Sequence, residues 1–230
     1  MDKDKLIDVK QTFALWCAST AARSSPKCRF PVAKGIDIAR NSPLLCYRTL
    51  DKLFKEITLP ASEFSPSKCH PNKFDPNNFP LNRFDALHAD IRKDLIRAAE
   101  EKITNKKMKF THGVAAKFIN VYFKAMFLND VSDDCSDQQK IINAFHPPID
   151  RVLLKTLAKE KVGGLEKFWR EKANKGWSNF SSDDYEDVIR HIKYVTKGRL
   201  WEIEEYWKID DKDDKGDKDD NNPTLPFYET

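Results

Sequence analysis

The chain has 230 residues, of which 40% are hydrophobic and 33% are charged. A chain of this length can bury a core as one domain or as two small ones, and its composition is that of a soluble globular protein. No run of about 18 apolar residues occurs, so we expect no membrane-spanning helix. The polar first residues lack the pattern of a secretory signal, so we expect a cytoplasmic protein.

Charge is distributed unevenly along the chain. The formal net charge is +4, but residues 210–220 hold seven Asp and three Lys, and Glu229 adds one more negative charge. Residues 1–209 therefore carry a net charge of +9. A basic body with an acidic tail is typical of a protein that binds a polyanion, with the tail competing for the same surface. The alternative is a basic domain with a solubilising tail.

The cysteines indicate neither a disulfide framework nor a metal site. Five cysteines are scattered along the chain without a CxxC pair, which predicts reduced thiols. Cys69 and His70 are adjacent, but no second pair follows at the spacing of metal ligands. We therefore predict no metal and no cofactor.

Apolar residues three and four positions apart predict helices along most of the chain, and strand patterns are nearly absent, so the predicted fold class is all-α. Ser181, followed three residues later by Asp184, resembles a capping box at a helix start. Helices are expected over residues 3–23, 32–40, from Ser42-Pro43 onward, 82–103, from about Thr111, from Pro148, 165–173, from Ser181, and 200–209. In the first of them the predicted core positions are Leu6, Val9, Phe13, Trp16, Cys17 and Thr20.

The same patterns suggest how the chain is divided. Residues 1–56 are predicted to form an N-terminal helical unit and residues 82–209 a second helical region. Five prolines in residues 57–81 break regular structure, which predicts a surface loop and the best place for a boundary. Residues 210–230 have the composition of a disordered acidic tail.

A basic connection that ends in a glycine joins two of the expected helices. Free backbone N–H groups at the start of the second helix would point outward with the positive end of its dipole, which predicts a phosphate-binding hairpin. The alternative is that Gly113 only permits a tight turn between helices. The predicted nucleic-acid-binding residues are Lys106, Lys107, Lys109, His112, Gly113 and Arg151.

The stretch from Gly113 to Val121 reads GVAAKFINV, and Pro148-Ile149-Asp150 follows later in the chain. These residues resemble the helix-hairpin-helix DNA glycosylases, in which a Gly-Val-Gly-x-Lys-x-x-Asn-Val hairpin precedes a Val-Asp or Ile-Asp pair at the next helix start. The resemblance covers about residues 85–160. The chain departs from the family pattern at His112, Ala115 and Arg151 and in the 33-residue separation of Lys117 from Asp150. It has no four-cysteine cluster, so no iron–sulfur centre is implied.

The resemblance implies a base-excision enzyme of DNA repair, a hydrolase with lyase activity through a Schiff base. Lys117 would attack the sugar carbon, and Asp150 would assist deprotonation and stabilise the developing positive charge. An amine must lose its proton to attack, which burial favours and a neighbouring carboxylate opposes, so the site has to balance the two effects. DNA is the expected partner, with RNA as the alternative nucleic acid.

Each of these residues also has a structural interpretation. Lys117 shares a helical face with Asn120 and Lys124, and this face would then be solvated. Asp150 would stabilise a helix dipole, and His146 would be a turn residue. For the whole chain, the alternatives are a non-catalytic nucleic-acid-binding module and a helical protein-interaction domain. Aromatic side chains that could stack on a flipped base are Trp16, Phe110, Trp169, Trp177 and Trp201.

Overall fold

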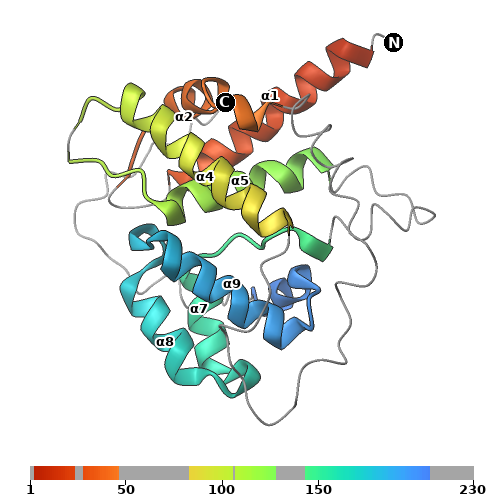
Figure 1. Cartoon of the computed structure of the whole chain (residues 1–230), viewed down its shortest axis with the longest axis vertical. Helices are drawn as coiled ribbons and strands as arrows, with labels where there is room; N and C mark the ends of the chain where they lie inside the picture. Colours follow the sequence, from red (N-terminus) through yellow and green to blue (C-terminus); the bar gives the residue numbers. More distant parts are fainter. Residues whose placement is uncertain (1–2, 24–27, 47–82, 106, 128–142, 208–230) are drawn as a thin grey trace, which may run out of the picture.

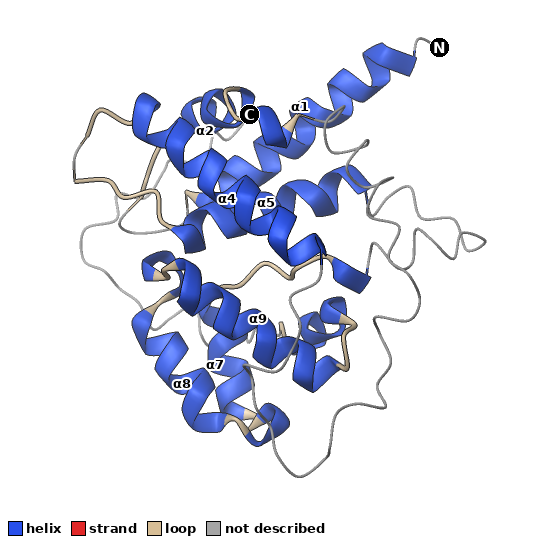
Figure 2. Cartoon of the chain, viewed as in Figure 1, coloured by secondary structure: helices blue, strands red, loops and turns tan. Residues whose placement is uncertain are grey.

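The computed structural model describes residues 3–23, 28–46, 83–105, 107–127 and 143–207. Every regular element in these ranges is helical, which confirms the predicted all-α fold class (Figure 2). None of these helices is long and apolar enough to cross a membrane. The predicted loop 57–81 and the predicted acidic tail 210–230 lie outside the described residues. The α-helices are α1 (Lys3–Ala22), α2 (Val32–Arg40), α4 (Arg83–Lys102), α5 (His112–Phe127), α7 (Arg151–Lys159), α8 (Glu166–Lys175) and α9 (Ser182–Thr196), and the 3₁₀ helices are η1 (Pro43–Leu45), η6 (Val162–Gly164), η7 (Trp177–Asn179) and η8 (Leu200–Tyr206).

Local hydrogen bonds at the helix starts explain where two of the helices begin. The side chain of Ser181 accepts a hydrogen bond from the backbone of Asp184, and the Asp184 side chain accepts one from the backbone of Ser181. This confirms the predicted capping box, which satisfies N–H groups that have no partner within the helix. Asp150 caps α7 in the same way, by accepting a hydrogen bond from the backbone N–H of Leu153 at 2.9 Å.

Helix α5 is the centre of the fold. Eleven of its sixteen residues are buried, and it contacts α1, α4, α9 and η7. In Figure 1, α1, α2 and α4 lie around α5 in the upper half of the molecule, and α7, α8 and α9 form the lower half. One apolar core includes side chains from both halves. The described part of the predicted N-terminal unit therefore packs on the same core as the region from residue 82 onward.

The predicted core face of α1 is wrong. Leu6, Val9, Phe13 and Trp16 are 49% to 61% exposed. The helix has a second apolar face with smaller side chains, and this face is the buried one, because alanines let the α1 backbone approach α5 closely. Spacing of three and four residues identifies a helical face but does not choose between two apolar faces. The buried residues of this second face are Ala14, Leu15, Ala18 and Ala22.

Candidate functional site

The fold brings the two predicted catalytic side chains together. Lys117 lies on α5, Asp150 lies at the start of α7, and the Nζ atom of Lys117 is 3.6 Å from Oδ2 of Asp150. The other carboxylate oxygen, Oδ1, caps α7. Asp150 therefore has the structural role considered from the sequence and also faces the lysine amine.

Both side chains of this Lys117–Asp150 pair are largely buried. The side chain of Lys117 is 10% exposed and that of Asp150 is 14% exposed, so the alternative of a solvated lysine face is wrong. Burial lowers the pKa of Lys117 because the ammonium group loses hydration, and the attraction of Asp150 opposes this only in part. The neutral amine is therefore more populated here than on an exposed lysine.

An indole ring covers the same amine. Nζ of Lys117 lies 4.5 Å from the ring centroid of Trp177, which is 7% exposed. The face of an indole ring attracts a nearby ammonium group and excludes water from one side of it. Trp177 is one of the five aromatic residues considered for a base pocket, and it follows Lys117 by 60 residues. Nothing in the sequence alone distinguishes it from the other four.

Gly113 allows this arrangement of Lys117 and Trp177. A Cβ atom at Gly113 would lie 1.8 Å from the carbonyl oxygen of Trp177, so only glycine lets the start of α5 rest directly against η7. The N–H of Gly113 donates to the carbonyl of Phe180 at 3.3 Å. Lys117 follows Gly113 by about one helical turn, so this contact fixes the indole near the amine.

The first amide groups of α5 do not point outward as predicted. Besides the N–H of Gly113, the N–H of Val114 approaches Thr111 Oγ1 at 3.3 Å and that of Ala115 donates to the Thr111 carbonyl at 2.9 Å. Nine residues rather than a short turn separate α4 from α5, and the helix-hairpin-helix element is not confirmed. Among the predicted nucleic-acid-binding residues, Lys107, Lys109 and Arg151 are exposed, His112 is partly buried, Gly113 is buried, and Lys106 lies outside the described residues.

Gly113→Ala is expected to destabilise the protein, although alanine favours a helix over glycine by about 1 kcal/mol. The added methyl group would overlap the backbone of Trp177, and overpacking of this kind costs roughly 1–3 kcal/mol. Urea denaturation would measure the change. Gly164→Ala is a useful comparison, because a Cβ there meets nothing within 4 Å and any cost would come from its positive φ of 73° alone. A Gly113→Ala protein as stable as the wild type would contradict the proposed contact.

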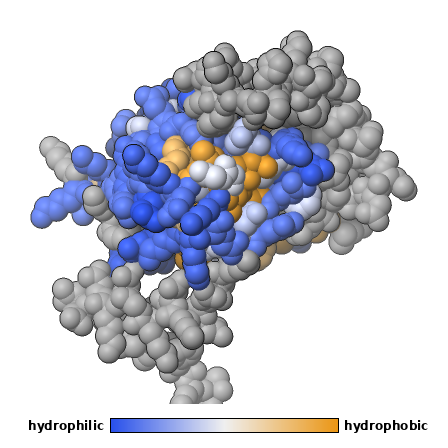
Figure 3. Space-filling model, turned by 90° about the horizontal axis from the view of Figure 1, so that it is seen from below, coloured by the Kyte–Doolittle hydropathy of each residue, from blue (hydrophilic) through white to orange (hydrophobic). Residues whose placement is uncertain are grey.

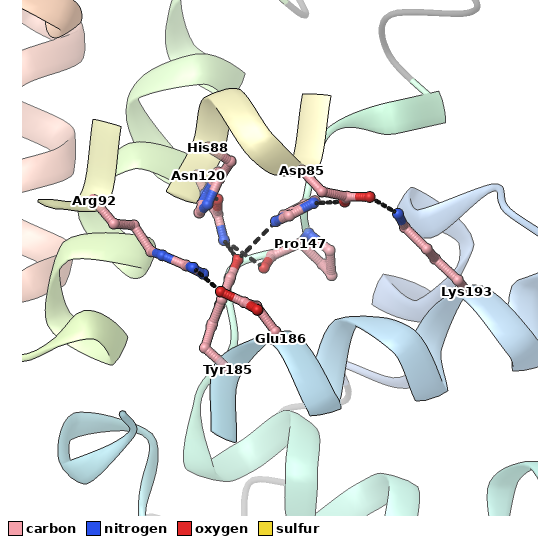
Figure 4. A network of polar contacts seen from close by, with 9 residues as sticks. Asp85, His88, Arg92, Asn120, Pro147, Tyr185, Glu186 and Lys193 are labelled. Atoms are coloured by element: carbon pink, nitrogen blue, oxygen red, sulfur yellow. Dashed lines mark hydrogen bonds and ion pairs between the residues drawn. The ribbon is translucent and has the colours of Figure 1, made fainter. Parts of the chain in front are cut away.

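A buried polar network connects α4, α5 and α9 to the segment that precedes Asp150 (Figure 4). Asn120 is at its centre. Its amide NH₂ group donates to the carbonyl of Pro147 at 2.8 Å and to the hydroxyl of Tyr185 at 2.9 Å. Its amide oxygen accepts a hydrogen bond from Nε2 of His88 at 2.8 Å. The residues of the network that Figure 4 labels are Asp85, His88, Arg92, Asn120, Pro147, Tyr185, Glu186 and Lys193, and hydrogen bonds to Tyr185 and Asp85 add His146.

Hydrogen-bond directions in the network follow from its donors and acceptors. Because Tyr185 accepts from Asn120, its own O–H is free to donate to Nδ1 of His146, 3.1 Å away. Nε2 of His146 then donates to Asp85 at 2.9 Å, and the other oxygen of Asp85 accepts from Lys193. Burial lowers the pKa of His146, and the nearby Asp85 reverses this only in part, so His146 is neutral at pH 7. Its interpretation as a simple turn residue is therefore wrong.

The network and the Lys117–Asp150 pair connect the same two parts of the chain. Asn120 follows Lys117 by one helical turn, and Pro147 precedes Asp150 by three residues. Asn120 therefore holds the segment 146–150 against α5 close to the point where Asp150 meets Lys117. Sequence reasoning missed Asp85, His88 and Arg92, although they share one face of α4 with its apolar residues, which is an available signal of buried polar groups.

Asn120→Ala is expected to cost about 3 kcal/mol of stability, because it leaves buried groups of His88 and Pro147 without these partners and removes one of the two hydrogen bonds of the Tyr185 hydroxyl. Asn120→Asp should cost more at pH 7, since a carboxylate has no N–H to give to Pro147. Protonation of the new aspartate restores one donor. The difference in the free energy of unfolding between Asn120→Asp and Asn120→Ala should therefore shrink as the pH falls from 7 to 5. Urea denaturation at both pH values would measure it. A pH-independent difference would show that Asn120 does not donate to these groups.

Comparison of the chain with family models, with curated proteins and with solved structures found no match. Within the described ranges, no group of three or more His, Cys, Asp or Glu side chains is arranged to hold a metal ion.

Proposed function

We propose that this chain is a DNA glycosylase-like base-excision enzyme with Schiff-base lyase activity, in which Lys117 is the nucleophile and Asp150 its acid/base and electrostatic partner. The observation that carries the proposal is the largely buried Lys117 amine, with its lowered pKa, 3.6 Å from Asp150. Perturbed lysines of this kind are more common at reactive sites than on ordinary helix surfaces. The resemblance to the helix-hairpin-helix DNA glycosylases rests on the same two residues.

The chemistry requires a neutral amine close to an acceptor for its proton. The lone pair of Nζ would attack C1′ of the damaged nucleotide, and the base would leave with the electrons of the glycosidic bond and gain a proton. Asp150 would stabilise the positive charge on the sugar during this step and then take a proton from the alkylated nitrogen. Opening of the sugar ring gives an imine between Lys117 and the DNA, and this imine precedes strand cleavage.

Partial exposure of the pair is compatible with access by a substrate. The side chains of Lys117 and Asp150 retain 10% and 14% of their accessible surface. A nucleophile must keep a path to solvent, which the more deeply buried side chains of Lys193 and Asp85, 3% and 4% exposed, do not have. The same pair would supply no chemistry in a non-catalytic nucleic-acid-binding module.

Borohydride trapping tests the proposal directly. The reagent reduces an imine to a stable secondary amine, so a protein–DNA adduct appears on a denaturing gel. Duplexes that carry an oxidised purine, an oxidised pyrimidine, uracil or an abasic site form a suitable panel, with an undamaged duplex as the control. We expect an adduct and strand cleavage with at least one lesion. Absence of both an adduct and base release across the panel would rule out the enzyme.

A further inference from the structure

The α7–α8 region is strongly basic, as are residues 102–129, which hold six Lys and no Asp or Glu. Residues 151–176 contain eight Lys or Arg and three Glu, a net charge of +5, whereas the next 33 residues contain five Lys or Arg and seven Asp or Glu. On the α9 side, Lys172 pairs with Asp187 at 3.0 Å and with Asp184 at 3.3 Å, and Lys175 also lies close to Asp184. Acidic residues of α9 therefore compensate two of the bases, Lys172 and Lys175.

Three basic residues form a row along the exposed side of α7. Arg151, Lys155 and Lys159 are four residues apart and exposed, so they lie one above another on the helix surface. The row is roughly 12 Å long, a distance over which one strand of duplex DNA presents about three or four phosphates. It begins at the residue after Asp150, so the start of the row adjoins the N-cap of α7 that faces Lys117.

A surface cavity continues this row toward α8. It has a volume of about 370 Å³, and its lining includes Lys155 and Lys159 from α7 and Arg170 from α8. Glu166, which pairs with Arg170, is the one acidic residue in the lining. Figure 3 views the end of the molecule where α7 and α8 lie, and it shows hydrophilic side chains around a small apolar area. The α7–α8 surface, defined as Arg151, Lys155, Lys159 and Arg170, thus combines the basic row on α7 with the basic residues that line this cavity.

We infer that the α7–α8 surface binds the phosphate backbone of duplex DNA and leads the strand to the Lys117–Asp150 pair. The choice of DNA as the polyanion rests on the proposed function. Phosphate contacts by Lys and Arg orient a duplex without reading its sequence, which suits a protein that must scan for a lesion. This surface takes the place of the glycine hairpin, whose amides are occupied within the protein.

Binding of an undamaged, fluorescein-labelled 20-base-pair duplex tests this inference without any chemistry. Fluorescence anisotropy between 50 and 200 mM salt gives the affinity and its salt dependence. The Lys155→Gln, Lys159→Gln double variant is expected to bind roughly ten to a hundred times more weakly at 0.1 M salt, and its log–log salt slope should be about 1.8 lower in magnitude, since each lost phosphate contact accounts for about 0.9.

Two double variants that remove the same charge locate the effect. Lys5→Gln with Lys34→Gln alters α1 and α2, in the half of the molecule opposite to α7 and α8 (Figure 1). Lys107→Gln with Lys109→Gln alters the connection before α5, which sequence reasoning favoured. The inference holds if only the α7 variant loses affinity and slope. Equal losses of DNA affinity in all three variants would show that binding depends only on net charge. A loss of affinity confined to the Lys107 and Lys109 variant would show that the connection before α5 is the binding surface. Either result overturns the inference.

The binding assay and the borohydride-trapping test can fail independently of each other. The probe carries no lesion, so it binds whether or not Lys117 reacts with a sugar. Loss of adduct formation with intact salt-dependent binding would leave a non-catalytic DNA-binding module. If the protein bound a single-stranded RNA probe, the α7 variant weakened that binding, and duplex DNA did not bind, the choice of partner would be overturned.

Discussion

Lys117→Gln is expected to abolish the borohydride-trapped adduct and to lower the rates of base release and strand cleavage by roughly a thousandfold or more, as removal of a nucleophile typically does. Glutamine keeps most of the length of the side chain but has no basic nitrogen. Mass spectrometry of the trapped wild-type protein should place the added sugar fragment on Lys117. Fold and DNA affinity should change little, because the amide still fits under Trp177 and the α7–α8 surface is untouched.

Lys124→Gln is the matched control for this variant. It lies two turns further along the same helix, and its amine pairs with Glu204 rather than with Asp150. We expect it to form the adduct at close to the wild-type rate. If the adduct persisted in Lys117→Gln and disappeared in Lys124→Gln, the nucleophile would be Lys124, and the role proposed for Lys117 would be wrong.

The pH dependence of trapping gives a second readout of the same amine. Only the neutral amine attacks, so the adduct rate should rise with pH and level off near the pKa of Lys117, which burial holds below that of an exposed lysine. Asp150→Asn removes the carboxylate that raises this pKa, and the plateau should therefore begin at a lower pH. Asparagine still caps α7, so the variant should fold. Its maximal rate should fall, because no charge would then stabilise the cationic sugar.

Helix starts were accessible from the sequence because they depend on short-range patterns, whereas the Lys117–Asp150 pair, 33 residues apart, was suggested by a resemblance to a family motif. Ser181 and Asp184 mark a helix start through bonds within four residues, and the pair was predicted from a motif that contains both of its members. The structure confirms the helix start and brings Lys117 and Asp150 together, but the hairpin to which the motif belongs is not confirmed.

The remaining features of the site depend on contacts that sequence spacing does not encode. Trp177 reaches Lys117 only because the α5 backbone rests on η7 at Gly113, and no local pattern relates these segments. For the same reason the sequence leaves two interpretations of Gly113 open, a phosphate contact and a turn that only glycine permits, since close packing and close approach by phosphate require the same residue. The exposed face of α1 has a similar origin, because two apolar faces compete and only the partner helix selects one.

Asp85→Asn is expected to cause the largest loss of stability, about 3–5 kcal/mol, because it leaves the ammonium group of Lys193 without its carboxylate partner. The side chains of Lys193 and Asp85 are 3% and 4% exposed, so water cannot replace the lost charge. Asparagine still offers an oxygen to His146. The measured loss would therefore report mainly on the unpaired Lys193 rather than on the hydrogen bond.

The acid stability of the wild type should reflect the same residues. Burial alone would raise the pKa of Asp85, but the hydrogen bond from His146 and the charge of Lys193 together hold it well below its usual range. A carboxyl group with a depressed pKa stabilises the fold above its unfolded pKa of about 3.9, and this contribution is lost as the pH falls below that value. The lowered pKa of His146 adds a loss that begins below about pH 6.5. Asp85→Asn should still lose stability as His146 becomes protonated, but it should lack the further loss of stability below about pH 4 that comes from protonation of Asp85.

The double variant Asp85→Asn, Lys193→Met separates a charge effect from a loss of packing. Methionine resembles lysine in length and removes the unpaired ammonium, so the double variant should recover to within about 1–2 kcal/mol of the wild type. Urea denaturation followed by tryptophan fluorescence would measure both. If the single variant does not fold, return of a cooperative transition in the double variant carries the same information. A double variant no more stable than Asp85→Asn would show that Lys193 and Asp85 are not energetically coupled. The position of His146, and with it the segment that carries Asp150, would then depend on contacts other than this ion pair.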